Sequence, residues 1–538
     1  MYLVLGATMT PLGRWILLAA IGLAAALPAR SQDKPKKTEL TSRIDQILES
    51  KWSKANTAPV ADDGEFLRRL SIDLRGMPPG EDEARAFMSN PGATKRLEKI
   101  EEYLAGPEYP QLWSRIWADI MFPNFRDIYV QSGKNLVRGT SNRMTKELLK
   151  WLSDHVAKDT PLPRMIAELL EAYGKSEENP LILYKLSFYN GGGDAPLEFA
   201  DGFSKAWLSV RVSCARCHDH PFDQWKQEHF YGLAAFFARQ RVKHFGGRKN
   251  DECDEVELWE DKTGDMSMPD TGRMMPPTYL YGGRAGTNEG RMTSLAKLVI
   301  MDPVRQLPRS TANRVWSILM GRGLVNPVDD FNRKNKVMYP DLLEAMTKDF
   351  AGHAFSIKHL IRGICASKAY QLSSGRDAET ATEDFSRHVT RQMRTEQLLN
   401  SLVVATRGPE PVQKRADGYK GLWDGFAGQL GLIYGPGVPY NEVTQLPGNT
   451  RQALMMRNSE LVNRMLKNGG GVLSKICGDP EPAERKIERL FVAILTRTPR
   501  EGELKRWTDY VKERGGGPEA FEDVAWTLIN TSEFSTRH

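Results

Sequence analysis

Residues 342–365, LLEAMTKDFAGHAFSIKHLIRGIC, contain two successive runs in which apolar residues recur about every three or four positions. In order along the chain, these apolar residues are Leu342, Leu343, Met346, Phe350, Ile357, Leu360, Ile361 and Ile364. Because an α-helix completes a turn in about 3.6 residues, this spacing gives each run one apolar face. The stretch therefore predicts two helices that pack onto a core.

The same helical spacing recurs along the rest of the chain. It is found in residues 97–104, 148–156, 165–173 and 487–494, and no run typical of strands is as clear. These patterns predict a mainly α-helical, multi-helix protein with long irregular loops and little strand. A further helix is predicted to begin with Thr498 as its N-cap, followed by Pro499 in the first turn and Glu501 reaching back.

The composition is ordinary for a folded protein, which excludes collagen-like, disordered and multi-span membrane proteins. The 538 residues include 74 Lys and Arg against 68 Asp and Glu, a formal net charge of +6. Acidic and basic residues are interleaved without a concentrated basic stripe, so nucleic-acid binding is not predicted. Five cysteines do not make a dense disulfide scaffold.

The first 31 residues have the features of a secretory signal peptide. Arg14 precedes an apolar run from Trp15 to Leu27, and small residues follow it. The run is shorter than the roughly 20 residues that a membrane-spanning helix needs. We therefore predict a signal peptide at residues 1–31, a linker at 32–42 and a periplasmic or extracellular location, without a further membrane span. An uncleaved N-terminal anchor is the alternative.

The residue types that carry chemistry are concentrated in residues 212–239. Cys214, Cys217 and His218 have the C-x-x-C-H spacing of c-type haem attachment. Two thiols one helical turn apart can add to the two vinyl groups of one haem, and the adjacent imidazole can then bind the iron. This motif predicts an exported protein that binds haem c and transfers electrons.

Two other interpretations of the motif stay open. His220 and Asp223 follow directly, so His218, His220 and Asp223, with one or both thiolates, could instead bind zinc or iron. Such a centre would suit an extracytoplasmic enzyme acting on polysaccharide or sulfated substrates. Alternatively, a Cys214–Cys217 disulfide would stabilise a non-catalytic scaffold. The sequence does not decide whether the protein is an enzyme.

Methionines in an irregular segment could supply a second axial ligand to a haem iron. They lie about 50 to 60 residues beyond His218 and are Met266, Met268, Met274 and Met275. Thioether ligation would suit electron transfer. The alternative is that these side chains fill space between a loop and the core.

Several blocks of sequence resemble one family of proteins. FLRRLSIDLRGMPPGEDEARAFM at residues 66–88 and CARCHDHPFDQWKQEHFYGLAAFF at 214–237 resemble the first domain of large exported planctomycete proteins. NRVWSILMGRGLVNPVDDF at 313–331 resembles their second domain. The two are a cytochrome-like domain of unknown function, 1549, and a companion domain of unknown function, 1553.

The resemblance implies an organisation for the chain. We expect a cytochrome-like helical domain at residues 43–244, an irregular segment at 245–292 and a C-terminal helical companion domain at 293–538. The family also suggests a secreted sulfatase-like partner protein, while the redox partner is not indicated.

Charged residues within these blocks have structural interpretations. Asp73 and Arg75 are predicted to form a structural ion pair rather than to act in catalysis. Arg314 is predicted to pack between domains. Asp329 and Asp330 could form a carboxylate site, but their context is also typical of a helix exit and turn.

Overall fold

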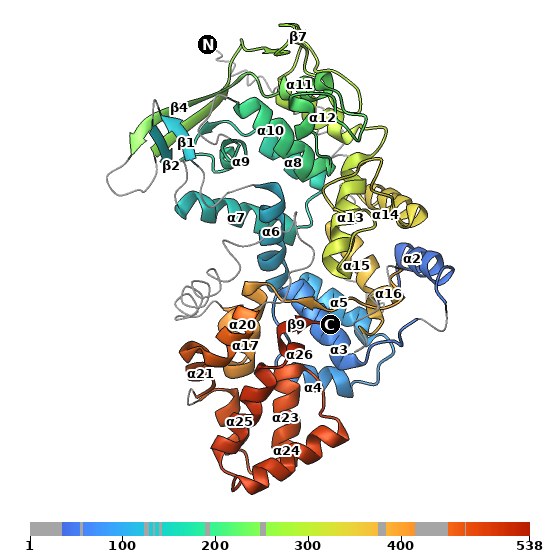
Figure 1. Ribbon diagram of the computed structural model, residues 1–538, viewed down its shortest axis with the longest axis vertical. Helices are drawn as coiled ribbons and strands as arrows, with labels where there is room; N and C mark the ends of the chain where they lie inside the picture. The colour runs from blue at the N-terminus through green and yellow to red at the C-terminus, as the bar shows by residue number, and fades with distance from the viewer. Residues whose placement is uncertain are drawn as a thin grey trace, which may run out of the picture. The chain divides into compact units, whose positions relative to one another are not determined.

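The computed structural model describes residues 35–53, 57–122, 129–132, 135–138, 142–188, 194–247, 254–374, 384–414, 450–467 and 470–538. Residues Lys37–His538 form one compact unit. The described residues are mostly helical and form only small sheets, so the predicted mainly α fold is confirmed (Figure 1). The predicted signal peptide at residues 1–31 lies outside the described residues, as do Cys253 and residues 415–449.

The apolar stripes in the sequence correspond to helices with one buried face. The helices concerned are α5 (Lys95–Ala105), α7 (Asn142–Ala157), α8 (Leu162–Leu170), α14 (Pro340–Gly352), α15 (Ile357–Cys365) and α23 (Ala483–Leu495). In α14 and α15 every apolar residue of the two predicted runs is buried. Tyr173 lies beyond the end of α8, so that predicted stripe extends three residues too far.

A first hydrophobic cluster lies among helices from residue 39 to residue 371. Besides α5, α7, α8, α14 and α15, these are α2 (Glu39–Glu49), α3 (Asp63–Arg75), α4 (Glu81–Ser89), α6 (Glu108–Met121), α9 (Ile182–Leu186), α10 (Ala195–Phe203), the π-helix η1 (Ser204–Leu208), the 3-10 helix η2 (Ser213–Arg216), α11 (Gln227–Ala234), α12 (Arg291–Ile300), α13 (Gln306–Met320) and α16 (Lys368–Gln371). Trp113, Trp117, Trp207 and Trp316 are its largest buried side chains. Helix α2 begins at Glu39, within the predicted linker.

A second hydrophobic cluster lies among the later helices. These are α17 (Thr395–Arg407), α18 (Glu410–Gln413), α20 (Thr450–Asn458), α21 (Glu460–Leu466), α22 (Val472–Gly478), α23, α24 (Glu501–Glu513), α25 (Pro518–Ile529) and α26 (Ser532–Ser535). Helix α3 contributes Leu67, Leu70 and Leu74 to the first cluster and Ile72 to the second. Figure 1 shows α4 beside α23, a contact that crosses the predicted domain boundary. The predicted boundaries themselves stay a prediction.

The start of α24 differs from the prediction. The helix begins at Glu501, and its N-cap is Arg500 instead of Thr498. The Arg500 backbone N–H donates to the Glu503 carboxylate at 2.9 Å, and Glu503 is also paired with Arg497. The ion pair places the Glu503 carboxylate, instead of that of Glu501, where it can cap the helix. The helix therefore starts two residues later than the sequence pattern predicts.

Strands are short and peripheral to the helices. They are β1 (Tyr129–Ser132), β2 (Asn135–Arg138), β3 (Gly174–Lys175), β4 (Gln240–Gly247), β5 (Asp254–Glu260), β6 (Met266–Ser267), β7 (Met274–Met275), β8 (Arg391–Gln392) and β9 (Thr536–Arg537). The one three-stranded sheet in the described residues has the order β3-β5-β4 and is antiparallel. Val256 and Leu258 alternate with polar residues in β5 and are buried, so part of the predicted irregular segment is a strand.

In the part of the chain that the structure describes, every helix is too short or too polar to cross a membrane.

Candidate functional site

The C-x-x-C-H motif lies on the surface, in η2 and the turn that leads to α11. Cys214 and Cys217 are free thiols, and both are exposed, as is His218. Between them Ala215 is buried, which fixes the short helix to the core. The Tyr231 hydroxyl of α11 donates to the Arg216 carbonyl oxygen at 3.1 Å, and desolvation raises the pKa of Tyr231, so this donor stays protonated. The motif is thus held in place while its thiols remain accessible.

The segment before the motif is anchored by α13. The Gln306 side chain donates to the Leu208 carbonyl oxygen at 2.7 Å, and the Ser310 hydroxyl donates to the Trp207 carbonyl oxygen at 2.8 Å. These side chains satisfy carbonyl groups that the end of η1 leaves without helical partners. Helix α13 therefore sets the position at which the chain enters the motif.

An ion pair supports the same entry point from another loop. Arg211 donates through Nε and Nη2 to both oxygens of the Asp329 carboxylate, and the shortest of these distances, from Nη2 to Oδ1, is 2.8 Å. The Phe331 backbone N–H donates to the Ser209 carbonyl oxygen at 2.7 Å. Asp329 thus has a positioning role. Sequence analysis did not predict its partner Arg211. The only indication in the sequence is that Arg211 lies three positions before Cys214.

Hydrogen bonding fixes the tautomer of His218. Its Nδ1 lies 2.8 Å from the Asp219 carbonyl oxygen. Because a carbonyl oxygen can only accept, Nδ1 carries the proton, and Nε2 of the neutral ring has a free lone pair. No described residue hydrogen-bonds to that Nε2. A ligating histidine usually has this arrangement, in which the other ring nitrogen donates to a carbonyl group.

The two nearby histidines have the opposite arrangement. Nδ1 of His220 accepts from the Phe222 backbone N–H at 3.2 Å, and Nδ1 of His229 accepts from the Lys226 backbone N–H at 3.1 Å. In each neutral ring the proton is then on Nε2, so the only lone pair of the ring is already used. Of the three histidines, His218 alone presents a free ring nitrogen to a ligand.

The predicted non-haem ligand set, His218, His220 and Asp223, does not converge. Asp223 accepts from the Gln224 backbone N–H at 2.8 Å, and Asp219 accepts from the Gln227 backbone N–H at the start of α11. Among the described residues, the one group of three potential metal donors within 4.8 Å of one another lies elsewhere in the chain. The carboxylates near the motif close turns and cap a helix, and the ligand role of this set stays a prediction.

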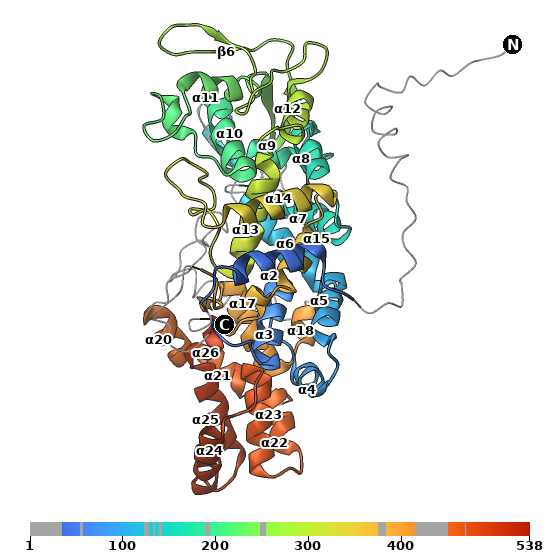
Figure 2. The ribbon, with the colours of Figure 1, turned by 90° about the vertical axis from the view of Figure 1, so that its right-hand side faces the viewer.

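The methionine-containing loop lies against α11, the helix that follows the motif. Figure 2 shows β6 beside α11, and both β6 and β7 contact this helix. Met268 and Met275 are 8% and 9% exposed and belong to the core. This agrees with the alternative interpretation, in which these side chains fill space between the loop and the core. Met266 is partly buried against the same core, whereas Met274 is 56% exposed. Met274 is therefore the one exposed methionine of the four.

The other charged residues singled out in the sequence are structural. Arg314 is buried and donates to the Lys205 carbonyl oxygen, which agrees with a packing role. Asp73 and Arg75 do not pair with each other, because residues two apart on a helix point in different directions. Asp73 instead pairs with Arg537, and Arg75 pairs with Glu83 and Glu108.

Comparison with known proteins gives two matches to family models. Residues 43–242 match PSCyt2, a protein of unknown function (DUF1549), and residues 291–418 match PSD1, a protein of unknown function (DUF1553). The order of the two regions is the one that the sequence blocks predict. No curated protein and no solved structure matches the chain.

Proposed function

Because this chain belongs to the proteins that join a PSCyt2 region to a PSD1 region, we propose that it is an exported c-type haem protein that transfers electrons. The observation that carries the proposal is that His218 has a free Nε2 lone pair and that the two thiols of the same motif are free and exposed. Covalent attachment of haem c needs this donor set, namely two accessible sulfurs and an unprotonated ring nitrogen.

Each residue of the motif has a definite role in this proposal. Cys214 and Cys217 would hold a haem by adding their S–H groups across its two vinyl C=C bonds, which would form two thioethers without loss of an atom. His218 would offer the Nε2 lone pair as the ligand to the iron, and its Nδ1–H would keep the bond to the Asp219 carbonyl oxygen. When bound, the haem supplies a centre that gains and loses one electron.

The location and the partners belong to the same proposal. Thioether-bound haem is attached outside the cytoplasm, which agrees with the signal peptide predicted at residues 1–31. The family resemblance supports a secreted sulfatase-like protein as a partner, and the redox partner is still to be identified.

The test is expression of the full chain in a host that carries the cytochrome c maturation machinery. We expect a pyridine haemochrome spectrum of c type that persists after acid–acetone extraction. The double variant Cys214→Ser, Cys217→Ser should lose the extraction-resistant haem, because each thiol alone can still form one thioether, and His218→Ala should change the spectrum of the oxidised protein. His220→Ala is the matched control and should behave as the parent does, because its Nδ1 is occupied by a backbone N–H.

Other outcomes would reject the proposal in favour of a specific alternative. A colourless protein with stoichiometric zinc or iron that is lost in His218→Ala would indicate the non-haem centre. A colourless, metal-free protein without a titratable thiol at Cys214 or Cys217 would indicate the disulfide-bonded scaffold.

A further inference from the structure

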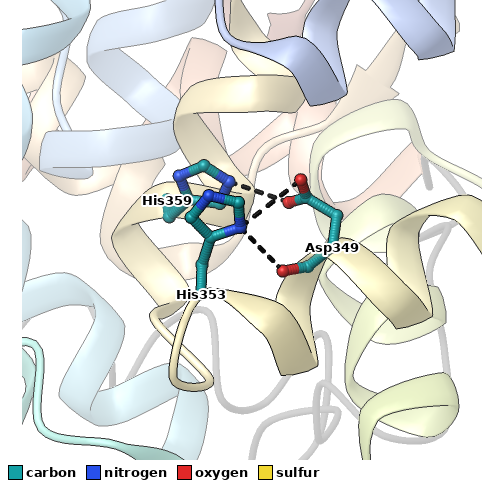
Figure 3. Close-up of side chains that lie close together, drawn as sticks. All are labelled: Asp349, His353 and His359. Carbon is teal, nitrogen blue, oxygen red and sulfur yellow. Dashed lines mark hydrogen bonds and ion pairs between the residues drawn. The ribbon is translucent and has the colours of Figure 1, made fainter.

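Three potential metal ligands meet where α14 ends and α15 begins. Asp349 lies in the last turn of α14, His353 follows directly after the helix, and His359 is the third residue of α15. Figure 3 shows both imidazole rings facing the Asp349 carboxylate. One donor atom from each residue lies within 4.8 Å of the other two. The stretch that predicts the two helices thus also contains a compact group of nitrogen and oxygen donors.

The contacts inside the group are short. Nε2 of His359 lies 2.8 Å from Oδ2 of Asp349, and Nδ1 of His353 lies 3.4 Å from Oδ1 of the same carboxylate. Nδ1 of His353 is also 2.9 Å from the Asp349 carbonyl oxygen. The rings are stacked, with centroids 3.8 Å apart and planes 13° from parallel. Nε2 of His359 is therefore hydrogen-bonded to the carboxylate, whereas Nδ1 of His353 donates to the Asp349 carbonyl oxygen and lies farther from the carboxylate.

The backbone between the helices holds the two rings together. Ala354 and Phe355 have φ angles of 53° and 56°, in the left-handed region that residues other than glycine seldom adopt. They reverse the chain tightly, and the Phe355 N–H donates to the Phe350 carbonyl oxygen at 2.9 Å. Ser356 then caps α15 by accepting from the His359 N–H at 3.0 Å. This tight turn places His353 over His359.

A contact with the preceding region fixes the start of α15. Asp159, after α7, accepts from the Lys358 backbone N–H at 3.1 Å and from the Ser356 hydroxyl. The backbone that carries His359 is thus bound on two sides. A rigid support of this kind keeps donors in place whether or not an ion is bound.

Burial leaves one side of the group accessible. The side chains of Asp349 and His359 are 14% and 15% exposed, whereas that of His353 is 52% exposed. An ion could enter beside His353 and replace two protons: the one that His359 shares with the carboxylate and the one that His353 donates to the Asp349 carbonyl oxygen. Ligands of a tetrahedral zinc ion, at about 2.0–2.2 Å from the metal, are about 3.3–3.6 Å from one another. The 3.4 Å separation lies within that range and the 2.8 Å separation is slightly below it. Because the two rings are stacked nearly parallel, one of them has to turn about its side-chain bonds for both lone pairs to meet at a single ion.

We propose that Asp349, His353 and His359 form a binding site for a divalent transition-metal ion of the zinc type. Two imidazoles and one carboxylate are the ligands that zinc accepts in protein sites with an open fourth position, which water fills. Mg²⁺ and Ca²⁺ prefer all-oxygen sites, so neither should compete. The site shares no residue with the C-x-x-C-H motif and does not depend on the proposed haem.

The experiment uses the full chain with Cys214→Ser and Cys217→Ser, so that these thiols cannot take up the ion. We expect isothermal titration with Zn²⁺ to give one ion per chain, and Mg²⁺ to give no binding. Co²⁺ in place of Zn²⁺ should give a visible d–d absorption band. Adding either His353→Ala or His359→Ala should weaken Zn²⁺ binding at least about 100-fold, because loss of an outer-shell partner alone costs about 10–100-fold.

A matched control comes from a histidine that pairs with one carboxylate only. Nε2 of His155 lies 3.0 Å from the Glu168 carboxylate. Among the described residues, His155 does not belong to a group of three potential metal donors. His155→Ala should leave Zn²⁺ binding unchanged. Since His353 is largely exposed, His353→Ala should also keep the circular dichroism of the parent. Absence of stoichiometric Zn²⁺ binding, or binding that both His353→Ala and His359→Ala retain, would overturn the proposal.

Discussion

At the scale of single residues, the buried carboxylate of Asp73 has an unusual environment. It pairs with Arg537 at 2.8 Å and accepts from the Tyr370 hydroxyl at 2.7 Å, and both ionic side chains are less than a tenth exposed. Burial raises the pKa of Asp73 to about 6 although Arg537 opposes the shift. The folded state therefore binds this proton more tightly than the unfolded state does. The contribution of Asp73 to stability is present below about pH 4 and is lost as the pH rises through about 6.

Asp73→Asn should remove this dependence on pH. Relative to the variant, the parent should lose about 2 kcal/mol in free energy of unfolding between pH 4 and pH 7, since one pKa unit corresponds to about 1.4 kcal/mol and part of the shift already acts at pH 4. Urea unfolding of both proteins across this range measures the difference. Asp270→Asn, at an exposed position, is the control and should keep the dependence of the parent. If the free energy of unfolding of the parent, relative to that of Asp73→Asn, stayed constant or rose with pH, the assignment would be contradicted.

At the scale of elements, the start of α24 illustrates how a local pattern is overruled. Thr498, Pro499 and Glu501 fit a helix start, yet Thr498 is exposed and does not cap the helix. Arg497 pairs with both Glu503 and Glu533, and Glu503 is thereby placed to accept from the Arg500 N–H. The contact with α26 selects one of two helix starts that the sequence permits.

Replacing Glu503 by Ala should therefore destabilise the protein more than replacing Thr498 by Ala. Loss of a capping interaction costs about 1 kcal/mol, and Glu503→Ala loses in addition an ion pair with Arg497. Thr498→Ala should change the free energy of unfolding by less than about 0.5 kcal/mol, as is usual for exposed positions. Chemical unfolding of the two variants gives the comparison. Equal losses, or a larger loss for Thr498→Ala, would mean that Thr498 is the cap after all.

At the scale of the whole molecule, α3 connects the two hydrophobic clusters of residues 37–538. Its Leu70 is buried in the first cluster and its Ile72 in the second. From the same helix, the buried Arg68 donates to the carbonyl oxygens of Ile494 at 3.1 Å and Phe534 at 2.9 Å. Because α3 contributes buried side chains to both clusters, unfolding of this helix would expose apolar surface in both. We therefore expect the two clusters to unfold together.

Calorimetry can test this coupling directly. The chain should unfold in one thermal transition, and both Leu70→Ala and Ile72→Ala should lower the temperature of that whole transition. Each substitution removes a fully buried aliphatic side chain, which costs about 2–5 kcal/mol. Two separate transitions, of which Leu70→Ala moves one and Ile72→Ala the other, would show that the clusters are independent.

The sequence by itself determined the helical character of this protein, the apolar faces of α14 and α15 and the adjacency of Cys214, Cys217 and His218. These features depend on spacing along the chain, because a helix brings together residues three and four positions apart. The two family regions could likewise be identified from short blocks.

Only the tertiary structure decided which of these residues can act together. It pairs Asp73 with Arg537, places Arg211 against Asp329 and leaves Nε2 of His218 free. It also stacks His353 on His359, although both lie in the stretch that sequence analysis treated as helix and core. Ion pairs and tautomers depend on which groups meet when the chain returns on itself. Apolar periodicity specifies that a face is buried but not what it is buried against.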